Sequence, residues 1–147
     1  MNTNHPEYFY DDIRINCVFG TFPGMIWNGG GVLSNSNIPD INEIIRIKEL
    51  YEFYNIPLKL TLTNPSLTKE DCYDRYCNKV VELMQNEHNM ILVSSPILEE
   101  YLREKYPNYK YCKSIIASEF DCDYEKELEK YYEIVLPRRA VKDFNFL

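Results

Sequence analysis

Apolar positions in this chain recur with two periods, one of two residues and one near 3.6 residues. Five short runs rich in β-favouring side chains predict strands at residues 13–19, 57–63, 90–94, 109–117 and 133–136. Helical spacing predicts four helices between them, at residues 41–54, 69–85, 96–105 and 124–132. This regular alternation predicts right-handed βαβ crossovers and a parallel sheet of about five strands.

Polar residues mark where the predicted helices begin. Asp40 and Glu43 have the spacing of a capping box before the helix 41–54. Thr68 precedes the helix 69–85, and Ser95 followed by Pro96 is a typical start for the helix 96–105.

The strand 57–63 alternates strictly, with leucines on one face and Lys59, Thr61 and Thr63 on the other. A central parallel strand is usually apolar on both faces, so the polar face is expected to look toward solvent, a cavity or a barrel interior. We expect the leucines to pack against the helices. An inward Lys59 needs a partner, unless its side chain extends to solvent at the rim of the sheet.

Two architectures fit this order of elements. One is an open, doubly wound sheet, and the other is the first half of a (βα)8 barrel, since a whole barrel takes about 250 residues. Residues 1–12 are expected to form a polar N-terminal arm, and residues 13–147 a single α/β domain.

Composition and charge exclude several classes of protein. The apolar content of 45% and charged content of 27% are ordinary for a globular domain. A net charge of −7 argues against binding to nucleic acid or to an anionic membrane surface, because both need a basic face. The first residues have neither a basic region nor an apolar run, so no signal peptide is predicted and a cytoplasmic location is expected.

The five cysteines form no C-x-x-C pair and are expected to be reduced thiols. With only His5 and His88 available, no metal site within the chain is expected, and no cofactor is indicated. No nucleophile has an obvious base, because His88 falls between a helix and the start of a strand.

A glycine-rich stretch from Val18 to Gly31 begins at the end of the first predicted strand and contains the only tryptophan, Trp27. Glycines let a loop bring main-chain N–H groups close to a ligand, most naturally an anion. The alternative is a loop held in place by a tryptophan packed on the core. The spacing matches neither the dinucleotide fingerprint nor the phosphate loop.

Ligands of parallel α/β proteins bind at the carboxyl ends of the strands, and we expect Trp27 to cover that end near Asn64. The candidate ligand-binding residues are Thr21, Trp27, Asn28, Gly29, Gly30, Lys59, Asn64, Ser94, Glu119 and Arg138. Each also has a structural interpretation, as a turn residue at Asn64, a helix cap at Ser94, or a solvated side chain at Glu119 and Arg138.

Several segments together resemble a group of poorly characterised bacterial (βα)8-barrel proteins that are distantly similar to the collagenase-like peptidase family. The segments are Phe19–Pro23 with Trp27–Gly30, Pro57–Asn64, Asp74 with Cys77–Asn78, and Ser94–Leu98 with Glu100–Leu102. The resemblance covers only the amino-terminal half of such a barrel. It implies a basic residue after the glycines, where this chain has Gly31.

Two functions follow as expectations. The first is a barrel-like protein, or half of one, that binds a small polar or peptide-like ligand and is related to hydrolases. The second is a non-catalytic binding or assembly module. A half barrel leaves strand edges and one sheet face uncovered, so a homodimer or a missing carboxyl-terminal half is the expected partner.

Overall fold

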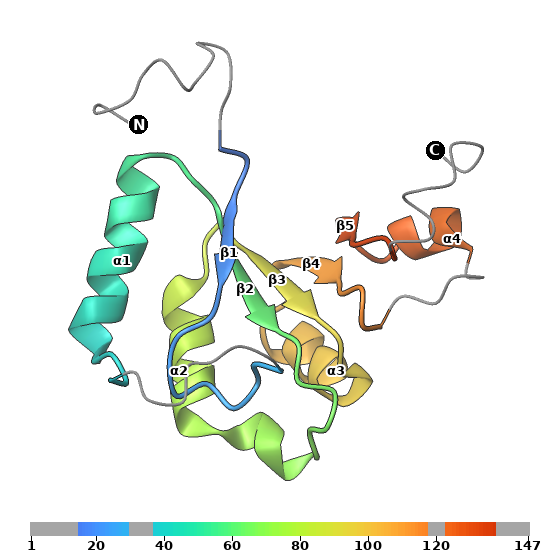
Figure 1. The fold of residues 1–147 in the computed structure, drawn as a ribbon, viewed down its shortest axis with the longest axis horizontal. Helices are drawn as coiled ribbons and strands as arrows, with labels where there is room; N and C mark the ends of the chain where they lie inside the picture. The colour runs from blue at the N-terminus through green and yellow to red at the C-terminus, as the bar shows by residue number, and fades with distance from the viewer. Residues whose placement is uncertain (1–14, 30–36, 118–122, 138–147) are drawn as a thin grey trace.

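The computed structural model describes residues 15–29, 37–117 and 123–137. Its elements are, in chain order, β1 (Val18–Gly20), α1 (Ile41–Phe53), β2 (Leu58–Leu62), η2 (Glu70–Tyr73), α2 (Arg75–Met84), β3 (Met90–Val93), α3 (Pro96–Lys105), β4 (Lys110–Lys113), α4 (Tyr124–Leu128) and β5 (Glu133–Ile134) (Figure 1).

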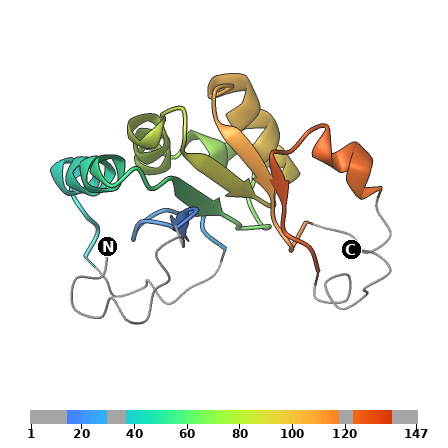
Figure 2. The same cartoon turned by 90° about the horizontal axis from the view of Figure 1, so that it is seen from above.

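The predicted parallel α/β fold is confirmed. All five strands are parallel, and their order in the sheet is the order of the chain, β1-β2-β3-β4-β5. Helices α1, α2 and α3 lie along one face of the sheet (Figure 2). A doubly wound sheet reverses its strand order, whereas the order of these described strands does not reverse. The described strands form an open arc with β1 and β5 as its edges.

The leucines of β2 face the helices, as expected. Leu60 and Leu62 belong to the buried core, and Leu58 packs against it. Lys59 is buried but lies outside this core, on the face that the helices do not cover. The alternation in the sequence therefore assigned the two faces of β2 correctly.

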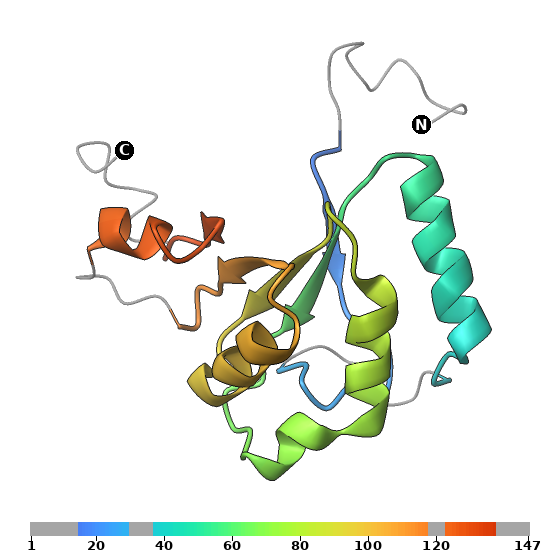
Figure 3. The ribbon, with the colours of Figure 1, turned by 180° about the vertical axis from the view of Figure 1, so that it is seen from behind.

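Helix starts follow their capping signals. The Asp40 carboxylate accepts the Glu43 N–H, and the Glu43 carboxylate accepts the Asp40 N–H, both at 2.9 Å. Helix α3 has the bounds that the sequence predicts, with Ser95 as N-cap and Pro96 in its first turn. Seen from behind, α2 and α3 lie in front of the strands, and α1 lies beside α2 (Figure 3).

The prediction of one helix over residues 69–85 is wrong. The chain forms the short 3-10 helix η2, breaks at Asp74 and restarts as α2. The Asp71 carboxylate holds both the N–H and the hydroxyl of Thr68, which favours a tight turn. Asp74 then caps α2 by accepting the Cys77 N–H at 2.8 Å.

All five predicted strands are longer than the observed ones, and so is the last predicted helix. Within the described residues, β1 is confined to Val18–Gly20 and β5 to Glu133–Ile134. Strand β4 ends at Lys113, because the Ser114 hydroxyl accepts the Ile116 N–H and starts a turn. Helix α4 ends at Leu128, and the Tyr132 N–H donates to the Tyr111 carbonyl, which leads the chain back to the sheet.

Gly29 is required by a close approach between two backbones. A Cβ atom at this position would lie 2.0 Å from the Thr63 carbonyl oxygen and 2.7 Å from the Asn64 Cα atom. By contrast, a Cβ atom at Gly20 would meet nothing within 4 Å. Gly29 therefore lets the loop after β1 pack directly on the end of β2.

We expect Gly29→Ala to lower the free energy of unfolding by about 2 kcal/mol, because the backbone must shift to admit the methyl group. Gly20→Ala is the matched control and should change it by less than about 0.5 kcal/mol. Urea denaturation of both variants measures the difference, and equal stabilities would contradict this packing.

Candidate functional site

The loop after β1 lies at the carboxyl end of the sheet, where the sequence places it. The Asn64 N–H donates to the Trp27 carbonyl at 3.0 Å, so Trp27 is beside Asn64 as expected. Its indole is fully buried, and its N–H donates to the Asp71 carbonyl at 2.8 Å. The ring meets Tyr101 edge-on, with centroids 6.3 Å apart. Trp27 thus holds the loop to the core, and its indole presents no surface to a ligand.

The other described candidates in this loop also make contacts within the chain. Asn64 donates to the Ile26 carbonyl at 2.9 Å and accepts the Ser66 N–H at 3.0 Å. The Thr21 hydroxyl contacts the Met25 sulfur at 3.4 Å, and Asn28 is half-buried. Gly30, Glu119 and Arg138 lie outside the described residues.

Ser94 differs from these residues because its hydroxyl has no partner in the described part of the chain. Among the described residues, Ser94 Oγ is the one buried side-chain oxygen or nitrogen that makes no hydrogen bond. The neighbouring Ser95 hydroxyl accepts the Leu98 N–H, so Ser95, and not Ser94, caps α3. Ser94 follows Val93 of the helix-side core, and alternation along the strand directs it to the uncovered face.

Lys59 and Glu133 form an ion pair on the same uncovered face. Lys59 Nζ lies 2.6 Å from Glu133 Oε1, and the exposed fractions of the two side chains are 7% and 38%. Burial lowers the pKa of Lys59, but the hydrogen bond and the charge of Glu133 help to raise it above its ordinary value. Lys59 is therefore a cation at neutral pH and not a nucleophilic amine.

This ion pair also defines the shape of the sheet. Lys59 is on β2 and Glu133 on β5, so two whole strands separate them. Three strand spacings amount to about 14 Å, and side chains stand roughly perpendicular to a flat sheet. A contact of 2.6 Å therefore requires the sheet to curl toward this face, which makes it concave. We call it the concave face below.

Two buried cysteines, Cys112 beside the ion pair and Cys77 in the helix-side core, do not form a reactive site. Burial raises the pKa of the Cys112 thiol to about 11, although the charge of Lys59 lowers it, and burial raises the pKa of Cys77 to about 12. Both thiols stay protonated at neutral pH, and the thiolate is the nucleophilic form. No group of three or more metal-ligating side chains occurs within the described residues.

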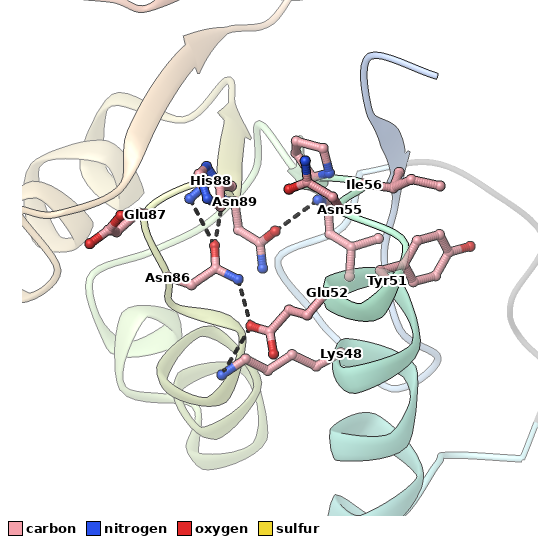
Figure 4. Close-up of a pocket in the computed structure, with 11 residues that line it drawn as sticks. Lys48, Tyr51, Glu52, Asn55, Ile56, Asn86, Glu87, His88 and Asn89 are labelled. Atoms are coloured by element: carbon pink, nitrogen blue, oxygen red, sulfur yellow. Dashed lines mark hydrogen bonds and ion pairs between the residues drawn. The ribbon is translucent and has the colours of Figure 1, made fainter. Parts of the chain in front are cut away.

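A pocket of about 320 Å³ lies at the opposite, amino-terminal end of the sheet (Figure 4). His88 lines it, as its position before β3 predicts. Asn86 donates to the Glu52 carboxylate at 2.8 Å, while the buried Asn89 accepts the Leu58 N–H and donates to the Met84 carbonyl. These contacts join α1, α2 and β2 to one another. In βα folds this end serves stability, and the hydrogen bonds agree with that role.

Sequence reasoning missed Glu133 as a site residue. Glu133 was assigned to the start of the last strand, but nothing in that segment indicates which lysine forms an ion pair with it. The one usable signal was Lys59 itself, a charged residue in a strand that needed a partner.

Comparisons with protein-family models, with curated proteins and with solved structures returned no match. In addition, no helix of the described part is long and apolar enough to cross a bilayer. The described residues of the site offer a buried hydroxyl and an ion pair but no adjacent nucleophile and base.

We expect Glu133→Gln to lower the free energy of unfolding by about 1–2 kcal/mol, because it leaves the buried Lys59 charge without its counter-charge. The partial exposure of Glu133 places the effect below that of a fully buried pair. Glu82→Gln, which breaks the exposed pair with Lys79, is the control and should cost less than about 0.5 kcal/mol. Equal effects in chemical denaturation would show that the pair does not matter.

Proposed function

We propose that this chain binds a small polar or peptide-like ligand on the concave face, at the carboxyl ends of β2, β3 and β4. The observation that carries the proposal is the buried Ser94 hydroxyl without a partner. An unsatisfied buried hydroxyl costs about 1–3 kcal/mol, and a ligand that hydrogen-bonds to it would recover this.

Neighbouring groups support the same place. The β2–β3 and β3–β4 registers align Leu62, Val93 and Lys113, so the next residues along, Thr63, Ser94 and Ser114, form a row of hydroxyls. A hydroxyl both donates and accepts, which suits amides and other neutral polar groups. Lys59 and Glu133 lie deeper along the same face and add one charge of each sign.

We further propose that the protein is a cytoplasmic relative of the bacterial barrels distantly similar to the collagenase-like peptidases. Support comes from the shared segments around Trp27 and Asn64 and from the sequential strand order. The described residues offer no peptidase chemistry of their own, so the proposed role is binding and not hydrolysis.

An assembly module is the second candidate, and one observation favours it. Phe19 on the edge strand β1 is 73% exposed and is in register with Lys59, which places it on the concave face. A second copy, or a separate carboxyl-terminal half, would cover it. Light scattering after size exclusion distinguishes the two, since a monomer at all concentrations argues against self-association.

We expect Ser94→Ala to keep or slightly raise stability while it weakens ligand binding, because the hydroxyl has no partner within the described chain. Ser95→Ala is the matched control: it removes a helix cap and should cost about 1 kcal/mol without weakening binding once folded. A panel of dipeptides and amino-acid amides provides the probes, and amide chemical shifts of Thr63, Ser94 and Ser114 report binding. Loss of stability in Ser94→Ala, or probe shifts only at residues 86–89, would contradict the proposal.

A further inference from the structure

A second hollow, of about 410 Å³, lies where α3, the start of β4 and the segment before β5 meet. Its charged lining residues are all basic, although the chain carries a net charge of −7. The lining residues are Arg103, Pro107, Tyr109, Lys110, Tyr111, Lys130 and Tyr132. Three basic side chains and no carboxylate therefore line this hollow in an acidic protein.

Arg103 is held rigidly in this hollow. Its guanidinium carbon lies 4.4 Å from the centre of the Tyr111 ring and 5.0 Å from that of Tyr131. Its Nε donates to the Glu99 carboxylate at 2.7 Å, and one Nη donates to the Lys130 carbonyl at 3.0 Å. The other Nη has no hydrogen-bond acceptor among the described residues. A guanidinium fixed in this way loses little conformational entropy when it binds an anion.

Lys110 is the least compensated cation of the group. It is half-buried, and its Nζ lies 4.8 Å from the centre of the Tyr132 ring, but it forms no ion pair within the described part of the chain. Lys130 stands at the rim and is 3.7 Å from Glu127, a carboxylate that also binds Lys113. Glu99 and Glu127, the acids that pair with Arg103 and Lys130, do not themselves line the hollow.

Three tyrosines and Pro107 supply the rest of the lining, and the hydroxyls of two of these tyrosines are engaged elsewhere. The Tyr109 hydroxyl donates to the Val81 carbonyl at 2.6 Å, and the Tyr111 hydroxyl donates to the Tyr106 carbonyl at 2.9 Å. The hollow thus combines cationic donors with ring surface. Oxyanions accept hydrogen bonds from such donors, and a planar apolar group packs against such rings.

We propose that this hollow binds the oxyanion group, phosphate or carboxylate, of a small aromatic molecule. Lys110 and the open Nη of Arg103 hold the anion, Lys130 adds charge at the rim, and Tyr132 with Pro107 contacts the ring. The site is separate from the concave-face site, because it lies beside the amino-terminal end of β4, before the β5 pairing begins at Cys112.

The test is a titration of the ¹⁵N-labelled full chain, followed by amide chemical shifts at constant ionic strength. The probes are phenyl phosphate and benzoate, which share an aromatic ring but differ in their anionic group. Benzyl alcohol is the neutral control. We expect saturable shifts at Lys110, Tyr111 and Tyr132 with at least one anion, and none at Ser94. Lys110→Gln should weaken the affinity about tenfold or more, whereas Lys110→Arg should retain most of it.

Lys126→Gln is the matched control, since Lys126 is an exposed cation of α4 that does not line the hollow. Tighter binding of phenyl phosphate identifies a phosphate site, and tighter binding of benzoate identifies a carboxylate site. The proposal is overturned if neither anion shifts these amides, if benzyl alcohol binds equally well, or if Lys126→Gln weakens binding as much as Lys110→Gln. Because Ser94 serves as a separate reporter, failure here leaves the concave-face proposal to its own test.

Discussion

A buried lysine on the concave face, Lys59, constrains the curvature of the sheet because it needs a counter-charge. Removing the ammonium group of Lys59 from water costs free energy unless an anion pairs with it. In this fold the anion is Glu133, on the edge strand β5. Because two strands lie between them, the pair and the curl of the sheet depend on each other. The curl leaves α1, α2 and α3 on the convex side and makes the opposite face concave.

The concave face holds the candidate site for a neutral polar ligand. At the carboxyl end, the glycine-rich loop after β1 is held by contacts within the chain. The Trp27 indole donates to the Asp71 carbonyl, and Gly29 packs closely on the Thr63 carbonyl. That rigid rim leaves the buried Ser94 hydroxyl as the unsatisfied group. The position of Ser94 at the carboxyl end of the strands, rather than a reactive side chain, makes that end of the sheet the best candidate for a binding site.

Local signals explain how much of this could be predicted from the sequence. Helix α3 matches at both ends because its cap, Ser95, and its terminating Pro107 lie in the segment itself. The assignment of the β2 leucines to the helix side and of Lys59 to the concave side follows from the alternation of apolar and polar residues. The break at Asp74 was missed because the Asp71 carboxylate accepts hydrogen bonds from Thr68, which favours a tight turn over a continuous helix. Helical periodicity does not reveal this contact.

Long-range contacts account for most of what could not be predicted. Trp27 was placed correctly beside Asn64, but its burial depends on a carbonyl 44 residues away. Likewise, the need of Lys59 for a partner is visible in the sequence, whereas Glu133, 74 residues away, becomes its partner only through the curl of the sheet. The basic hollow combines side chains of three segments and has no signature in any of them.

Zero-length carbodiimide coupling followed by peptide mass spectrometry tests this arrangement most directly, because the reagent joins a carboxylate and an amine only where they touch. The curled sheet predicts an amide bond between Glu133 and Lys59 in the native protein and its loss in urea. The pair of Lys113 and Glu127, whose charged atoms are 2.5 Å apart, provides the positive control. Coupling of that control without any native link between Glu133 and Lys59 would contradict the curl on which the account rests.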